Sequence, residues 1–153
     1  DPNNVVTLNL VADDYATRQT DLDKAETYAK KALDLAPTLA KPAGMADEQF
    51  TAYQNQRMGM ARLTLGYVAF QRGAKTRRYI PAIDQFKLAV DLLEANPALQ
   101  GRALYYLGYA YEASVPPNRK GAIEALTRAA SLPSPWQAQA QDILAKIKAA
   151  VTR

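Results

Sequence analysis

The chain has 153 residues, enough for one domain with a substantial core; 48% are hydrophobic and 22% are charged, as in ordinary globular proteins. It contains neither cysteine nor histidine, which excludes disulfides, thiolate nucleophiles, imidazole bases and the usual zinc sites. The net charge of +4 is spread along the chain, and no apolar run approaches the roughly 20 residues of a membrane-spanning helix.

The first two predicted helices cover residues 3–17 and 21–36. Apolar residues recur there with the helical period and without the alternation of a strand, as in every other strongly periodic segment, so we expect an all-α fold. Thr20 or Asp21 is the expected N-cap of the second helix, and Pro37 closes it.

A long helix is predicted over 47–72. It follows a linker, residues 38–46, that contains proline and glycine, and Gly73 is its expected stop. The helix is two to three turns longer than a repeat unit needs. We expect the extra turns, which carry Phe50, Tyr53 and Arg57, to be an overhang packed by the linker; the alternatives are a wall for a binding groove or a dimer contact.

A basic loop follows the long helix. The densest positive cluster of the chain is Arg72, Lys75, Arg77 and Arg78. We expect a solvated loop here, with a phosphate or nucleic-acid patch as the alternative, and we expect no nucleic-acid partner. Pro81 is then placed in the first turn of a helix that reaches about Ala95.

Three more helices complete the chain. Asn96 caps a helix over 97–113, the Pro116-Pro117 pair forces a break, and Asn118 caps a helix that ends near Leu132. Ser134 and Gln137 have the spacing of a capping box for a last helix over 134–151. That helix has one apolar stripe and one polar face, which is typical of a terminal cap. The stripe comprises Trp136, Ala140, Ile143, Leu144, Ile147 and Val151.

One spacing of small and apolar residues recurs three times. It reads 25/29/32, 82/86/89 and 122/126/129, in each case on the second helix of a pair. On the partner helices a small residue stands at Ala12, Gly66 and Gly108. A glycine inside a helix costs about 0.5–1 kcal/mol relative to alanine, so we expect the two helices of each pair to approach closely at these positions.

The best copy resembles the tetratricopeptide repeat. It has Leu104, Leu107-Gly108 and Tyr111, followed by Ala122, Leu126 and Ala129. The copies are 57 and 40 residues apart at Ala25, Ala82 and Ala122, which exceeds the 34-residue unit of that family. The resemblance implies a right-handed superhelical stack of about three helix hairpins in a single domain, residues 1–153. The repeats would be 3–37, 47–95 and 97–132, with 134–151 as capping helix.

The carboxylates carry little catalytic information. Asp13-Asp14 and Asp21 with Asp23 are close pairs that could in principle do acid–base work or hold a metal, yet helix capping and solvation explain them. No phosphate-binding loop or nucleophile–base arrangement is visible. We therefore expect no enzyme, no cofactor and no metal.

A peptide groove is the better candidate site. The resemblance implies that the first helix of each pair lines a concave face, and side chains three or four residues apart share one side of a helix. Tyrosine offers a large area and a polar tip, which suits peptide binding. The alternative for each residue is packing between neighbouring helices. The candidate groove residues are Asn9, Asp13, Met60, Leu63, Tyr67, Phe70, Arg102, Tyr105, Tyr109 and Glu112.

These patterns predict a non-catalytic module that binds a protein or peptide. The alternative is a structural segment of a larger repeat scaffold, or a self-associating subunit, and a homo-oligomer is compatible with either. The chain starts at Asp1, so we expect a mature product or an excised piece. A cytoplasmic and an exported location, including the periplasm, are both compatible with the composition.

Overall fold

The computed structural model describes residues 1–152. These residues form seven α-helices and one 3₁₀ helix, joined by loops. No strand occurs within these residues, so the all-α prediction is confirmed. None of their helices combines the length and apolar character that crossing a bilayer requires. The helices are α1 (Val5–Thr17), α2 (Leu22–Leu35), η1 (Ala36–Thr38), α3 (Asp47–Gly73), α4 (Ile80–Leu92), α5 (Pro97–Ala113), α6 (Arg119–Ser131) and α7 (Gln137–Val151).

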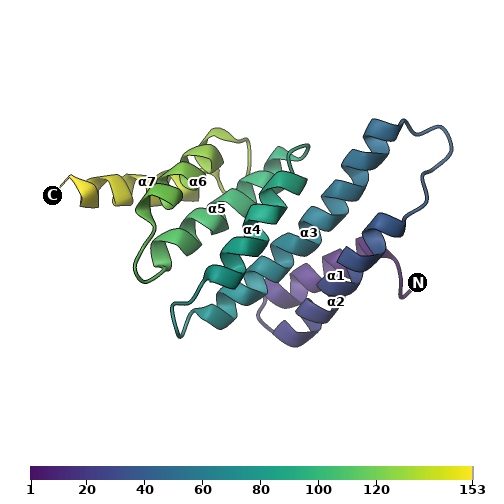
Figure 1. Cartoon of the computed structure of the whole chain (residues 1–153), viewed down its shortest axis with the longest axis horizontal. Coiled ribbons are helices and arrows are strands. Elements are labelled where there is room, and N and C mark those ends of the chain that lie inside the picture. The colour runs from purple at the N-terminus through teal and green to yellow at the C-terminus, as the bar shows by residue number, and fades with distance from the viewer. Residues whose placement is uncertain (153) are drawn as a thin grey trace.

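The helices succeed one another along the long axis of the molecule, and the two termini lie at opposite ends (Figure 1). Each helix packs against the next one in the chain. The odd-numbered helices are also in contact, α1 with α3, α3 with α5 and α5 with α7. We call the surface formed by α1, α3, α5 and α7 the odd-helix face.

Asparagine and aspartate side chains set the beginnings of four helices. In each case the side-chain oxygen accepts a hydrogen bond from the backbone N–H three residues later, which satisfies a group the helix itself leaves unpaired. The capping residues are Asn4, Asp21, Asn96 and Asn118, of which the last three were among the predicted caps.

The last helix begins at Gln137 rather than Ser134, so the predicted capping box is wrong. The side-chain Nε2 of Gln137 donates to the carbonyl oxygen of Ala130 at 2.9 Å, which ties α7 back to the preceding helix. The Ser134 hydroxyl instead accepts from the backbone N–H of Trp136 at 3.2 Å. The helix expected to reach Ala95 also ends earlier, at Leu92.

The recurring small residues lie where the paired helices meet. A Cβ atom on Gly66 would stand 2.5 Å from the Phe86 ring, and one on Gly108 would stand 2.5 Å from Leu126 Cγ. Real Cβ contacts are longer than this, so the expected close approach is confirmed for both pairs. All nine positions of the recurring spacing are fully buried: Ala25, Ala29, Ala32, Ala82, Phe86, Ala89, Ala122, Leu126 and Ala129.

The overhang of α3 is packed by the segment that follows α2. The side chain of Gln54 donates to the carbonyl oxygens of Ala36 and Pro37, at 3.3 and 3.2 Å. Met58 and Leu39 pack against the same small core as residues of α1. The overhang is therefore packed as expected, but mainly by η1, with Leu39 as the contribution of the 38–46 linker.

Candidate binding surface

The ten candidate residues lie on α1, α3 and α5, three helices that contact one another through the odd-helix face. These residues differ in how much of their surface is exposed to solvent. Four are buried, with exposed fractions of 1% to 9%, and serve the inter-helix packing that the sequence left as the alternative: Asn9, Leu63, Tyr67 and Phe70. The other six keep part of their surface accessible, and Tyr109 is the most open at 41%.

Asn9 shows why a polar side chain on this face is buried. Its Nδ2 donates a hydrogen bond of 3.0 Å to the backbone carbonyl of Arg57, in the overhanging part of α3. The amide therefore joins α1 to α3. Met60, one turn further along α3, is half-buried, and its sulfur lies 3.8 Å from Nη1 of Arg57.

An ion pair between Asp13 and Arg102 joins α1 to α5. The guanidinium donates two hydrogen bonds to the carboxylate, at 2.8 and 3.2 Å, and only 13% of the Arg102 side chain is exposed. Burial acts to lower the pKa of Arg102, but hydrogen bonding and attraction to Asp13 outweigh it, so the pKa is raised. The void beside the pair is only about 10 Å³, so α1, α3 and α5 pack closely around it.

Three stacked rings form what we call the aromatic row: Trp136, Tyr105 and Tyr109. The Tyr105 ring lies 5.1 Å from the Trp136 ring and 6.3 Å from the Tyr109 ring, with interplanar angles of 29° and 4°. Such stacking fixes the rings in place, and Tyr109, at one end of the row, remains 41% exposed. Trp136 comes from the turn before α7. The sequence placed it only on an apolar stripe, because its contact with α5 depends on how two helices meet.

The ring of Tyr106 packs against Tyr105 and Trp136 of the aromatic row. Its ring lies 5.1 Å from Tyr67, 5.8 Å from Phe86 and 5.2 Å from Trp136, so it contacts α3, α4 and the turn before α7. Sequence reasoning did not select it as a site residue, although it lies one position from the selected stripe. Burial raises its pKa to about 12, against which the positive charge of Arg102 acts more weakly.

The shift of Tyr106 predicts a loss of stability in alkali. A group whose pKa is higher in the folded than in the unfolded chain stabilises the fold below its unfolded pKa, here 10.0. That contribution disappears as the pH rises through about 12. We expect Tyr106→Phe to reduce the fall in unfolding free energy between these values by about 1–2 kcal/mol, measured by urea denaturation at a series of pH values. Equal slopes for the two proteins would contradict it.

Carboxylates flank the aromatic row. Glu112 lies one turn beyond Tyr109; its Oε2 is buried without a hydrogen-bond partner among residues 1–152, and its Oε1 is 4.0 Å from Nε of Arg119. Asp142 of α7 is close enough to Tyr105 to contribute to its raised pKa, of which burial is the main cause. The row thus combines one exposed tyrosine with nearby negative charge, a combination that suits cationic side chains.

The remaining acidic residues singled out from the sequence have structural partners. Asp14 pairs with Arg18 at 2.7 Å, Asp21 caps α2, and Asp23 pairs with Arg72 of α3. Asp21 thus caps a helix as expected, whereas Asp14 and Asp23 form surface ion pairs instead of being only solvated.

Comparisons with protein-family models, curated proteins and solved structures found no match to this chain. Its resemblance to a repeat family therefore depends on its own residues and on the helix arrangement described above.

Proposed function

We propose that the chain is a tetratricopeptide-like module that binds a protein or peptide on its odd-helix face. Three helix pairs share buried small residues at matching positions, and the first helices of successive pairs contact one another. Both features are expected of stacked repeats, in which the first helices line a concave face. A scaffold of this kind uses side chains of its surface to select partners, rather than a reaction centre.

The aromatic row is the observation that supports binding. An exposed tyrosine next to half-buried, stacked rings offers a rigid apolar area with hydrogen-bonding groups at the edge, so little conformational entropy is lost when a partner docks. Tyr109 is 41% exposed while its ring is held against Phe70 at 5.4 Å. Anchors of this kind contribute most of the free energy in protein interfaces.

The charges near the row favour one class of partner. Glu112 follows Tyr109 by one turn of α5, and 30% of its side chain is exposed although its Oε2 is buried. A lysine or arginine of a partner would stack on the ring and pair with this carboxylate. The proposed ligand is therefore a segment with a basic residue next to an apolar or aromatic one.

Selection from a displayed library of random peptides tests this proposal on the whole chain. We expect enriched peptides to carry lysine or arginine beside an apolar residue. Tyr109→Ala should weaken their binding about tenfold or more, the loss typical of an aromatic anchor. Leu88→Ala, an equally simple truncation of a 45% exposed side chain on α4, is the control and should leave binding unchanged.

A second variant separates binding from folding. Glu112→Gln keeps the shape of the side chain and should selectively weaken peptides that contain the basic residue. If the enriched peptides bind Tyr109→Ala and Glu112→Gln as tightly as they bind the original chain, the odd-helix face is not the binding surface.

A further inference from the structure

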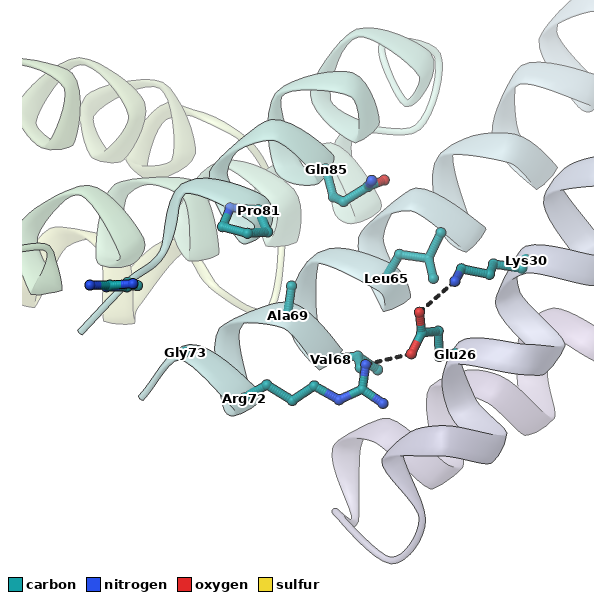
Figure 2. A pocket seen from close by; sticks show the side chains of 10 residues that line it. Glu26, Lys30, Leu65, Val68, Ala69, Arg72, Gly73, Pro81 and Gln85 are labelled. Carbon is teal, nitrogen blue, oxygen red and sulfur yellow. Dashed lines mark hydrogen bonds and ion pairs between the residues drawn. The ribbon is translucent and has the colours of Figure 1, made fainter. Parts of the chain in front are cut away.

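A cleft on the other side of α3 separates α2 from α4. Its volume is about 490 Å³, within the range of ligand sites. Figure 2 shows Leu65, Val68 and Ala69 of α3 at its floor, between Glu26 and Lys30 of α2 on one side and Pro81 and Gln85 of α4 on the other. We call this space the outer cleft. Its floor is apolar and its α2 wall is charged.

A second hollow adjoins the turn between α3 and α4. It has a volume of about 630 Å³ and lies between that turn and the α5–α6 loop. Ile80 and Val115 line it with exposed fractions of 71% and 65%, the highest among large apolar side chains in the described residues. Nε of Arg77 donates to the carbonyl of Ala113 at 3.2 Å, which connects the two loops. We call this hollow the turn pocket.

The outer cleft and the turn pocket share two lining residues, Arg78 and Pro81. They therefore adjoin at the α3–α4 turn, and we call the two hollows together the basic groove. Apolar side chains line both hollows, which suits an extended segment better than a compact small molecule.

Positive charge exceeds negative charge along the basic groove. Lys30, Arg72, Arg77 and Arg78 border it, and the one carboxylate in its lining is that of Glu26. Glu26 pairs with Lys30 at 2.6 Å and with Arg72, and these two hydrogen bonds lower its pKa, so it remains ionised at neutral pH. Arg77 and Arg78 have no carboxylate partner within residues 1–152. These two guanidinium groups are therefore available to pair with carboxylates of a partner.

We propose that the basic groove docks a segment of a partner protein in which acidic residues stand beside apolar ones. Charge complementarity assigns the acidic residues to Arg77 and Arg78, and the apolar residues fit the exposed side chains of Ile80 and Val115. The recessed floor argues against a lipid surface, because Leu65 and Val68 are 9% and 2% exposed and lie between the side chains of α2 and α4, where a flat bilayer does not reach. This site is separate from the aromatic row.

Fluorescence anisotropy with designed peptides tests the proposal on the complete chain. The probe is a labelled peptide with leucines spaced between aspartates; the two comparison peptides replace every aspartate with lysine, or every leucine with serine. We expect the aspartate–leucine peptide to bind at least tenfold more tightly than either, and its affinity to fall with added salt. Equal binding of the lysine peptide would overturn the proposal.

Matched variants locate the binding. Arg78→Glu and Lys148→Glu change the net charge equally, but Arg78 borders both hollows whereas Lys148 is exposed on α7. We expect about a tenfold loss for Arg78→Glu, a smaller loss for Val115→Ser, and none for Lys148→Glu. Equal losses for the two charge reversals would overturn the proposal, as would binding of anionic phospholipid vesicles without binding of the peptide. Tyr109→Ala should bind the peptide normally, which keeps this result independent of the odd-helix face.

Discussion

Replacing Phe86 with alanine is expected to lower the free energy of unfolding by about 3–5 kcal/mol. Phe86 is fully buried, and its ring lies against Gly66 of α3 and 5.8 Å from the ring of Tyr106 in α5. Its removal leaves a cavity where α3, α4 and α5 meet, and close-packed helices refill such a cavity only in part. Urea denaturation followed by circular dichroism measures the change. Leu88→Ala, on the exposed side of the same helix, is the control and should change stability by less than about 1 kcal/mol.

The contact between Gly66 and Phe86 adds a sharper test. In the original chain, Gly66→Ala places a methyl group 2.5 Å from a buried ring, so we expect a loss of about 1–3 kcal/mol through overpacking. In the Phe86→Ala chain the same substitution enters the cavity and gains about 1 kcal/mol of helix propensity. The sign of its effect should therefore reverse. Equal effects in the two backgrounds would show that Gly66 is not required by this close approach.

The helices could be predicted because their signals are local. Asp21, Asn96 and Asn118 each bond a backbone N–H three residues away, and the prolines act on their own turn. The prediction was wrong at Ser134, where Gln137 bonds to Ala130 in the preceding helix instead of to its own turn. That choice depends on how α6 and α7 meet, which the local pattern does not contain.

The face of the candidate site could be predicted, but its exposure could not. Residues spaced three and four apart identify one side of α3, yet whether Tyr67 is open depends on Tyr106, whose ring covers it from α5 at 5.1 Å. Trp136 reaches the aromatic row from outside the three helices that the repeat pattern selects. Long-range packing decides such points, and a single sequence records it only indirectly.

Only the positive charge of the basic groove could be predicted from the sequence. The cluster of Arg72, Arg77 and Arg78 was visible as charge and was expected to be a solvated loop. The structure pairs Arg72 with Asp23 and Glu26 of α2 and ties Arg77 to the carbonyl of Ala113. The hollows arise because α2 and α4 flank α3, and because two loops distant in sequence lie together.

Breaking the ion pair between α1 and α5 is expected to be the second most damaging change. Asp13→Ala leaves the guanidinium of Arg102, only 13% exposed, without its carboxylate partner. Removing one member of a fully buried pair costs about 3–5 kcal/mol; because 33% of the Asp13 side chain is exposed, we expect about 2–3 kcal/mol here. Asp14→Ala is the control: its pair with Arg18 is mostly exposed and should contribute less than about 1 kcal/mol.

A double-mutant cycle distinguishes the pair from simple packing. Arg102→Met keeps an apolar stem near the rings of Tyr106 and Trp136, which lie 5.9 Å from the guanidinium, and removes the charge. With that charge absent, Asp13→Ala should cost less than 1 kcal/mol, so the coupling between the two sites should be about 1–3 kcal/mol. Asp13 and Arg102 are 89 positions apart, and their helices each contact α3 but scarcely contact each other. We therefore expect Asp13→Ala to speed hydrogen exchange in α1 more than in α6; uniform acceleration, or a coupling near zero, would mean that packing on α3 alone holds the first helix pair in place.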